Sequence, residues 1–236
     1  MTPPAAGVVL AGGASARMGA AKAAVPWGDG TLLSRAVIAL RPAVGRVIVV
    51  RAPGQVLPPL PGGVAVTEDA HPGRGPLEGL AAGLAALRPG EVAFALAVDM
   101  PFAGAEVAAA VLAALPPGAD AAVPRAGGRA QPLAAAYRPG VADVARGLVA
   151  AGRPRMHDLL AAIRVAWVDA ADLPGGAAAL ANVNTPDELA AARRAAGRAA
   201  RQAMREYATT SPAATPPGGT IARASAPVSD VTAWEP

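Results

Sequence analysis

The sequence predicts an α/β protein with a single doubly wound, mostly parallel β-sheet. Short apolar segments typical of strands alternate along the chain with segments in which apolar residues recur at helical spacing. This alternation is the pattern of βαβ units, whose strands run parallel. Residues 46–50 show no polar alternation, as expected for a strand that is covered on both faces.

The expected strands comprise, in chain order, residues 7–10, 46–50, 64–67, 92–98, 121–124, 133–137 and 165–168. The first helix begins after Thr31, whose side chain suits an N-cap, and ends near Pro42 and Gly45. Further helices are expected after the loop that starts at residue 68 and at residues 106–115, 141–151 and 156–163. Residues 27–30 and 127–129 are expected to form turns.

The last helix has a clear start signal. Thr185 suits the N-cap, Pro186 the first helical position and Glu188 the third, which together form a capping box. We expect this helix to continue to about Tyr207 and to close a domain that spans residues 1–207. Residues 208–236 are rich in Pro, Thr, Ser, Gly and Ala without an apolar period, which favours a disordered tail.

Composition excludes several classes of protein. The chain of 236 residues is 53% hydrophobic but only 3% aromatic, so its core is expected to consist mainly of Val, Leu and Ala. The absence of cysteine excludes disulfides, thiolate metal sites and cysteine nucleophiles. We expect a cytoplasmic protein without a membrane partner, because no secretory signal is present and charged residues, Pro and Gly interrupt every alanine-rich run.

The net charge of +4 suits an anionic ligand. It would also suit nucleic acid, but the arginines are scattered along the chain and aromatic residues for base stacking are nearly absent. We therefore expect no nucleic-acid partner.

A glycine pair directly follows the first expected strand. The segment reads Leu10-Ala11-Gly12-Gly13-Ala14-Ser15-Ala16-Arg17-Met18-Gly19, and Lys22 stands three residues further on. Glycines let the backbone turn sharply and bring its N–H groups up to a phosphate. Arg17 and Lys22 add positive charge on either side, so the loop is expected to bind an anion.

Two carboxylates also follow strands directly. Asp99 ends the most apolar strand of the chain, and Asp69 follows residues 64–67. Ligands of doubly wound sheets bind beyond the carboxyl ends of the strands, so the glycine loop, Asp69 and Asp99 are expected at one edge. Asp99 is placed to hold Mg²⁺ against phosphates, with a helix N-cap as the alternative. For Asp69 the alternative is a loop cap.

The glycine loop matches neither a P-loop nor the Gly-x-Gly-x-x-Gly fingerprint. Its pattern Leu-Ala-Gly-Gly-x-Ser-x-Arg-Met-Gly, followed by Lys22, resembles the signature of nucleotidyltransferases of the molybdenum cofactor guanylyltransferase type. The resemblance extends from about Gly7 to Leu189 and implies a Rossmann-like nucleotidyltransferase domain. One departure is Arg51-Ala52-Pro53, where the family commonly has an asparagine that bears on the nucleoside pocket.

The resemblance also implies roles for individual residues. It implies catalytic roles for Arg17, Lys22 and Asp99, with Asp99 as the Mg²⁺ ligand in an Asp-x-Pro motif. Segment 75–79 is similar to the family's Gly-Pro-Leu-x-Gly turn near the base, and is otherwise a plain helix start. The implied binding residues are Leu10, Ala11, Gly12, Gly13, Lys22, Asp69, Gly75, Pro76, Leu77, Asp99, Asn182 and Asn184.

Asn182-Val183-Asn184-Thr185-Pro186 is the second distinctive motif. Two side-chain amides alternate along an extended stretch, and each can donate and accept hydrogen bonds to a heterocycle. Asx-turns that lead into the capping box explain the same residues equally well. The resemblance associates this motif with the pterin substrate. It places Arg153 and Arg155 in a basic stretch that meets the pterin's phosphate or is merely solvated.

Together these residues predict transfer of GMP from GTP to molybdenum-molybdopterin, with release of pyrophosphate. A molybdoenzyme or an insertion chaperone is the further partner that the family implies. The first alternative is a cytidylyltransferase acting on the same cofactor, although that relative tends to carry Ala-Gly and Asp-x-Asp at the two motifs. The second is a catalytically silent GTP-binding partner in cofactor insertion, against which the intact Lys22 and Asp99 argue.

Overall fold

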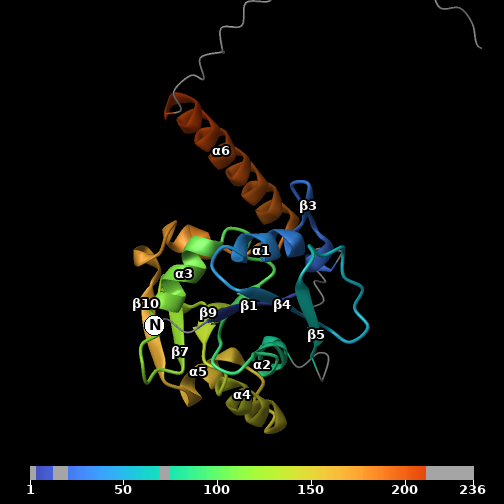
Figure 1. The fold of residues 1–236 in the computed structure, drawn as a ribbon, viewed down its shortest axis with the longest axis vertical. Helices are drawn as coiled ribbons and strands as arrows, with labels where there is room; N and C mark the ends of the chain where they lie inside the picture. Colours follow the sequence, from blue (N-terminus) through green and yellow to red (C-terminus); the bar gives the residue numbers. More distant parts are fainter. Residues whose placement is uncertain (1–3, 13–20, 70–74, 211–236) are drawn as a thin grey trace, which may run out of the picture. The chain divides into compact units, whose positions relative to one another are not determined.

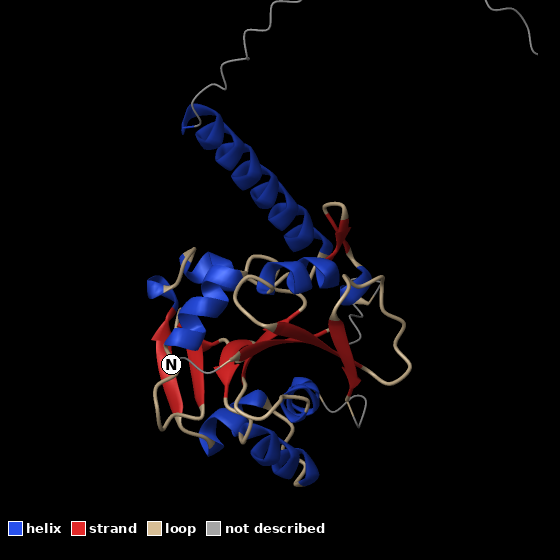
Figure 2. Cartoon of the chain, viewed as in Figure 1, coloured by secondary structure: helices blue, strands red, loops and turns tan. Residues whose placement is uncertain are grey.

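The computed structural model describes residues 4–12, 21–69 and 75–210, and these residues form an eight-stranded sheet with helices on both faces (Figures 1 and 2). The strands of this sheet are β1 (Ala5–Leu10), β4 (Arg46–Arg51), β5 (Val64–Glu68), β6 (Val92–Ala97), β7 (Ala121–Ala126), β8 (Arg129–Ala130), β9 (Ala134–Tyr137) and β10 (Val165–Asp169). A separate short hairpin pairs β2 (Pro26–Trp27) with β3 (Gly30–Thr31).

The helices are α1 (Leu32–Leu40), α2 (Pro76–Ala85), α3 (Ala105–Ala113), α4 (Val141–Ala150), α5 (Met156–Ala162) and α6 (Pro186–Thr210). Every expected helix and strand is present, with ends that shift by a few residues. The β2–β3 hairpin and the short 3-10 helices η1 (Lys22–Ala24), η2 (Ala170–Asp172) and η3 (Gly176–Leu180) were not expected. Segments of two to five residues are too short to show a hydrophobic period.

The sheet is mostly parallel, as predicted. Its strand order is β10-β7-β9-β6-β1-β4-β5, with β8 paired to β7. Strands β6, β1, β4 and β5 are neighbours and all run parallel. Strand β9 is antiparallel to both β6 and β7, while β10 is again parallel to β7. The carboxyl ends of the four parallel neighbours therefore meet at one edge, which confirms the common edge expected for Asp69, Asp99 and, among the described residues, the beginning of the glycine loop.

Strands without polar alternation occur here because each face of the sheet has its own apolar core. Val9 packs into the core under α1 and α3, whereas Val8 and Leu10 pack into the core under α2, α4 and α5. Figure 1 shows these two sets of helices on opposite sides of the sheet. Val47 and Ile48 on β4 divide between the two cores in the same way.

Both expected helix caps are present. The Thr31 hydroxyl accepts from the Ser34 backbone N–H, 3.2 Å between Oγ1 and N, and Ser34 Oγ accepts from the Thr31 N–H at 2.8 Å. At α6, Thr185 N–H donates to Glu188 Oε2 at 3.1 Å, and Glu188 N–H donates to Thr185 Oγ1 at 3.2 Å. These reciprocal bonds satisfy N–H groups that the first turn of a helix leaves unpaired.

The chain divides into two compact units, Met1–Ala195 and Ala196–Pro236. The sheet and the first part of α6 belong to the first unit, and the described residues of the second unit continue α6 to Thr210. Residues 211–236, the greater part of the predicted tail, lie outside the described residues.

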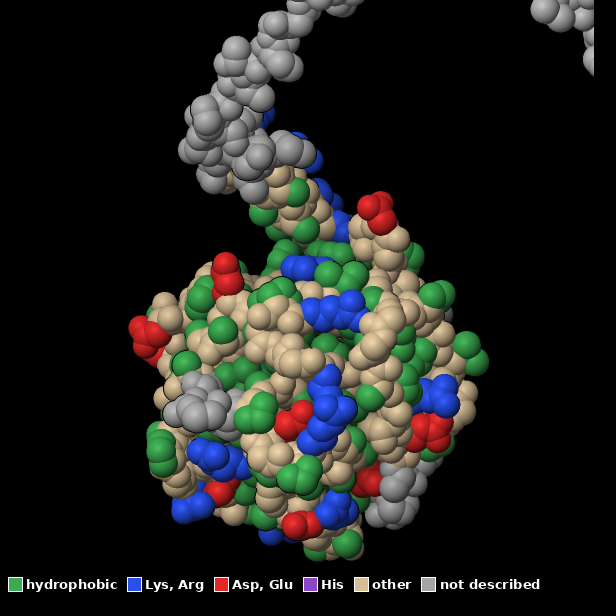
Figure 3. All heavy atoms as spheres, in the orientation of Figure 1, with side chains coloured by type: hydrophobic (Ala, Val, Ile, Leu, Met, Phe, Trp, Pro, Cys, Tyr) green, Lys and Arg blue, Asp and Glu red, His purple; other side chains and the backbone are tan. Residues whose placement is uncertain are grey.

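Charges on the face shown in Figure 3 are spread over several separate positions, with acidic side chains beside some of the basic ones. Several charged side chains of the described residues form ion pairs. Arg46 and Glu91 approach to 2.7 Å, and this hydrogen bond lowers the pKa of the Glu91 carboxyl. Arg164 and Asp120 lie 2.9 Å apart, and the bonds from Arg164 lower the pKa of Asp120 to about 2. Within the described ranges, no helix combines the length and apolarity needed to cross a bilayer.

The close packing of α2 against the sheet predicts a large effect of a small substitution. A Cβ at Gly83 would lie 2.3 Å from Val8 Cγ1 and 3.0 Å from Val50 Cγ2, so Gly83→Ala would force α2 or these valine side chains to move. We expect it to lower the free energy of unfolding by about 1–3 kcal/mol. The matched control is Gly147→Ala in α4, where a Cβ meets no atom within 4 Å.

The Gly147→Ala variant should gain about 0.5–1 kcal/mol, because alanine loses less backbone entropy than glycine in a helix. Urea unfolding followed by circular dichroism measures both variants. Equal effects of the same sign would contradict the packing described here.

Candidate active site

Three distant segments meet at the carboxyl edge of the parallel strands. The Lys22 ammonium donates to Asp99 Oδ2 at 2.6 Å and to Asn184 Oδ1 at 2.7 Å. Lys22 lies on η1, Asp99 lies two residues beyond the end of β6, and Asn184 precedes α6. The side chains of Lys22 and Asp99 are only 19% and 13% exposed, so the pair is largely shielded from water. The sequence prediction that the loop lysine and Asp99 converge is confirmed.

The segment that carries Asn184 is attached to the end of β6 by its backbone. Val183 N–H donates to the Asp99 carbonyl at 2.8 Å, and the Val183 side chain is buried. Asn184 N–H donates to Glu188 Oε2 at 2.6 Å, which ties the segment to the first turn of α6. Asn182, on the other side of Val183, is exposed. The structure therefore brings Asn184 to Lys22 and leaves Asn182 at the surface.

Asp99 retains one oxygen for a ligand. Its Oδ2 accepts from Lys22, whereas Oδ1 is buried and accepts no hydrogen bond from the described residues. The structure also excludes the N-cap alternative, because α3 begins after Gly104 and has no side-chain cap. A buried carboxylate oxygen without a partner is costly unless a ligand satisfies it.

The chemistry of Asp99 suits Mg²⁺. This hard cation prefers oxygen ligands and is commonly held by one or two carboxylates together with water and substrate phosphates. No group of three or more His, Cys, Asp or Glu side chains suitable for a metal occurs among the residues described. The residues present therefore fit a metal that substrate phosphates help to bind, and do not form an all-protein cage.

The start of the glycine loop is held between strands. Val98 N–H donates to the Leu10 carbonyl at 3.2 Å, and Ala11 N–H donates to the Val50 carbonyl at 2.9 Å. A Cβ on Gly12 would lie 3.5 Å from Ala52 N and 3.9 Å from Asp69 Oδ2, so Gly12 adjoins both residues. Gly13 and Arg17, which the sequence places in the same loop, lie outside the described residues.

Asp69 is held where the sequence places it, at the end of β5. Its backbone N–H donates to the Arg51 carbonyl at 3.0 Å, which continues the pairing of β5 with β4. Its carboxylate lies beside Gly12 as described above. Asp69 and the beginning of the glycine loop are therefore neighbours at the common edge.

Gly75, Pro76 and Leu77 form the start of α2. Gly75 is the N-cap with φ at +82°, a conformation that glycine adopts easily, and Pro76 occupies the first turn. Leu77 is fully buried in the core, so its side chain serves packing. The helix start and the ligand-binding interpretation are compatible, because the first N–H groups of a helix lack intrahelical partners.

The contacts of Arg153 and Arg155 do not indicate a ligand. Arg153 is exposed and bonds Asp158 at 2.8 Å, which lowers the pKa of the Asp158 carboxyl. Arg155 is the N-cap of α5 and makes no side-chain cap bond. The solvated interpretation of these arginines accounts for their contacts among the described residues.

The sequence analysis missed Gln55 as a component of this edge. Its side chain contacts the backbone of both Ala52 and Ala11, and its carbonyl accepts from Arg51. The sequence signal for this contact is the Pro53-Gly54 pair, which predicts a turn. A turn at this point brings the following residues back toward the end of β4.

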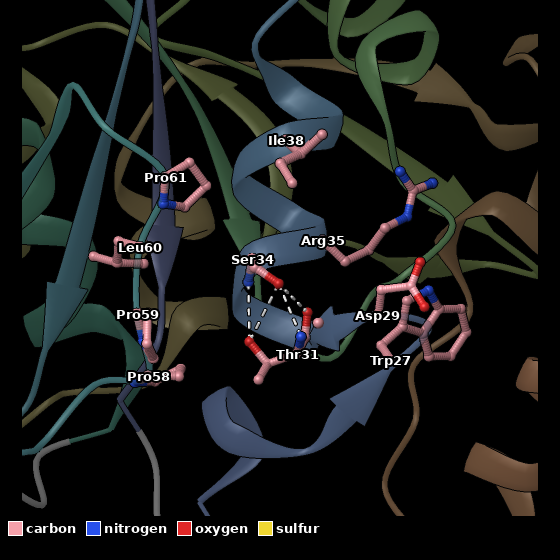
Figure 4. A pocket seen from close by; sticks show the side chains of 11 residues that line it. Trp27, Asp29, Thr31, Ser34, Arg35, Ile38, Pro58, Pro59, Leu60 and Pro61 are labelled. Carbon is pink, nitrogen blue, oxygen red and sulfur yellow. Dashed lines mark hydrogen bonds between the residues drawn. The ribbon is translucent and has the colours of Figure 1, made fainter. Parts of the chain in front are cut away.

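An open pocket of about 600 Å³ lies elsewhere, between α1, the β2–β3 hairpin and residues 58–61 (Figure 4). Its lining includes Trp27, Asp29, Arg35 and Ile38. Thr31 and Ser34 in its wall bond each other in the α1 cap. Of the described residues that the sequence singles out for binding or catalysis, none lines this pocket.

A family model, the MobA-like NTP transferase domain, matches residues 7–209. The chain belongs to the MobA-like NTP transferase family. It is therefore a nucleotidyltransferase, as the resemblance predicted, and its fold and enzyme class agree with the convergence of Lys22 and Asp99 at the strand ends.

Curated relatives agree with this family. A protein named probable molybdenum cofactor guanylyltransferase from Mycobacterium tuberculosis (strain H37Rv) is 41% identical over 180 residues, which cover 73% of this chain and 88% of the relative. A protein of the same name from Pelotomaculum thermopropionicum is 35% identical over 197 residues, covering 79% of this chain and 91% of that protein.

Solved structures share the MobA-like fold. Molybdopterin-guanine dinucleotide biosynthesis protein A from Archaeoglobus fulgidus has a TM-score of 0.66 at 22% identity, covering 82% of this chain and 99% of that one. A 2-C-methyl-D-erythritol 4-phosphate cytidylyltransferase from Thermus thermophilus has a TM-score of 0.61 at 23% identity, covering 83% and 99%. This chain thus shares its fold with both of these solved proteins.

Proposed function

We propose that this protein transfers GMP from GTP to molybdenum-molybdopterin and releases pyrophosphate. The observation that carries the proposal is the contact of Lys22 with Asp99 and Asn184, which joins a cation, a carboxylate and an amide at the strand ends. The names of the curated relatives and the two sequence motifs support guanine and the pterin as substrates.

The reaction is an in-line displacement at the α-phosphorus of GTP. A terminal phosphate oxygen of the pterin forms the new P–O bond while the bond to pyrophosphate breaks. A phosphate monoester is already anionic near neutral pH, so the protein needs no general base. Catalysis then consists of positioning the two substrates and stabilising negative charge.

Lys22 supplies that stabilisation from the protein. Its ammonium neutralises Asp99 in the structure and would turn toward the phosphates when GTP enters. The backbone N–H groups at the beginning of the glycine loop would hold the triphosphate, and Arg17 would add a second cation. Asp99 would bind Mg²⁺ through its carboxylate, and a bound Mg²⁺ would offset charge on the phosphate oxygens.

Pyrophosphate release from the purified protein with Mg²⁺, molybdenum-molybdopterin and either GTP or CTP tests the proposal. We expect release with GTP and little with CTP. Lys22→Ala and Asp99→Ala should each lower kcat by about 10²–10³-fold, the usual effect of losing a group that stabilises developing charge. The matched control is Arg164→Ala, which breaks an exposed ion pair with Asp120 before the start of β7 and should retain activity.

Each other outcome has a definite meaning. Release with CTP alone would replace guanine by cytosine as the base. Release with neither nucleotide, from protein that still binds GTP, would favour the silent GTP-binding partner. Unchanged rates in the Lys22 and Asp99 variants would remove these residues from catalysis.

The different surroundings of the two motif asparagines predict different kinetics. Asn184→Ala removes an acceptor from the Lys22 ammonium, and a hydrogen bond to a charged group is worth about 1.5–3 kcal/mol, so kcat should fall by about 10- to 100-fold. Asn182→Ala alters an exposed side chain and should raise the KM for the pterin without changing the KM for GTP. Steady-state kinetics with each substrate varied in turn distinguishes these effects, and identical kinetics of the two variants would refute the distinction.

A further inference from the structure

Residues 52–55 form a tight turn directly after β4. Gln55 N–H donates to the Ala52 carbonyl at 3.0 Å, Pro53 precedes Gly54, and Gly54 has φ at +71°. Proline at the second position and a left-handed glycine at the third are the features of a type II turn. The turn sends the Gln55 side chain back toward the end of β1.

The Gln55 side-chain amide joins this turn to the beginning of the glycine loop. Oε1 accepts from Ala52 N–H at 3.0 Å, and Nε2 donates to the Ala11 carbonyl at 3.0 Å. Only this orientation of the amide satisfies both contacts, because Ala52 offers a donor and Ala11 an acceptor. Gln55 and Ala11 are 44 positions apart in sequence, so the contact is a long-range one.

The Arg51 side chain also holds the turn in place, through the backbone of Gln55. Its Nη1 donates to the Gln55 carbonyl at 3.0 Å, and its Nη2 lies 2.7 Å from Glu68 Oε1 on β5. Arg51 and Glu68 are also partners in the register of the two strands. The backbone of Gln55 is therefore held by Arg51 of β4, which is itself paired with β5, while the Gln55 side chain contacts Ala11 directly after β1.

The contact with Ala11 fixes the plane of one particular peptide. In a trans peptide the carbonyl and the following N–H point in opposite directions, so the bond to the Ala11 carbonyl also sets the direction of the Gly12 N–H. The Ala11 N–H belongs to the preceding peptide and is already bonded to the Val50 carbonyl. The bond to the Ala11 carbonyl is therefore the one that sets the plane of the Ala11–Gly12 peptide. Without such a bond, glycine at position 12 would let the peptide rotate.

We propose that Gln55 is a positioning residue for nucleotide binding, acting through the Ala11–Gly12 peptide. It holds the Gly12 N–H in one orientation before GTP arrives, so that binding does not have to order this peptide. The inference rests on the proposed function, since it takes the glycine loop as the site of the triphosphate.

Gln55→Glu removes the donor to the Ala11 carbonyl but also adds a negative charge, so the neutral variant Gln55→Met is measured beside it. The carboxylate keeps the acceptor for Ala52 N–H, and so preserves the turn, but it cannot donate to the Ala11 carbonyl. We expect the Kd for GTP, measured by calorimetry on the full chain, to rise about 5- to 30-fold, as for the loss of one partly buried hydrogen bond. The KM for GTP should rise in parallel while kcat at saturating GTP stays within about threefold, because the contact serves binding. Gln55→Met, which keeps the length, loses both bonds and adds no charge, should also raise the Kd.

Arg138→Ala is the matched control. Arg138 likewise uses its side chain to hold backbone carbonyls, at 2.8 Å for Ala119 and 3.1 Å for Pro116, but it does so at the opposite edge of the sheet. We expect Arg138→Ala to lower Tm and to leave the Kd for GTP within about twofold of the wild-type value, because its contacts lie far from the glycine loop.

Three results would overturn the inference. A wild-type Kd in Gln55→Glu would show that the Ala11 contact is irrelevant to binding, and an equal rise in Arg138→Ala would show a general loss of stability. Neither result would affect pyrophosphate release by the unaltered protein, so the proposed function would stand. Failure of the unaltered protein to bind GTP or release pyrophosphate would instead overturn both proposals.

Discussion

The contact between Lys22 and Asp99 links the fold to its chemistry. Removing one member of a shielded ion pair leaves a buried charge uncompensated, at a cost of about 3–5 kcal/mol, so the two side chains stabilise each other while no ligand is bound. The same pairing holds the Lys22 ammonium at the strand ends. A triphosphate brings negative charge to which Lys22 can turn, and it leaves the Asp99 carboxylate available to a cation. In the proposed function, Lys22 would therefore face the phosphates of the nucleotide and Asp99 its metal.

The backbone supports this pair as much as the side chains do. Asp99 lies at the end of a strand that is buried on both faces, and its own carbonyl binds Val183. The position of Asn184 thus depends on a hydrogen bond to the same residue that Lys22 neutralises. A shift of β6 would move the carboxylate and the amide together, so their spacing around Lys22 is preserved. Positioning by one strand suits two groups, here Asp99 and Asn184, that have to act on one substrate.

Much of the architecture could be predicted from the sequence. Continuous apolar strands such as residues 46–50 can be recognised because each face of the sheet has its own core, and caps such as Thr31 and Thr185 mark helix starts by local hydrogen bonding alone. The common edge followed from parallel topology. Strands β2 and β3 escaped prediction because two residues show no period. The placement of β9 between β6 and β7 depends on long-range pairing that no local pattern reveals.

The candidate site likewise contains residues that could be predicted from the sequence and residues that could not. Lys22 and Asp99 were predictable because their motifs fall at the loop and at a strand end. For Gln55, Pro53-Gly54 indicates the turn, but the contact itself was not predictable, since its partner is the Ala11 backbone carbonyl 44 residues away. Asn184 was predicted as a ligand for the pterin, yet the structure gives it a second task, as an acceptor for Lys22. Arg17 and Gly13, outside the described residues, remain predictions.

The order of the chain has a consequence for biosynthesis. The amide that completes the environment of Lys22 comes from residue 184, after the last strand of the sheet at residues 165–169. A nascent chain of which β1 to β10 have just left the ribosome already contains Lys22 and Asp99, but Val183 is not yet there to cover the Asp99 carbonyl. The contacts of Asp99 and Lys22 with this segment therefore form only after all the strands of the sheet have been synthesised.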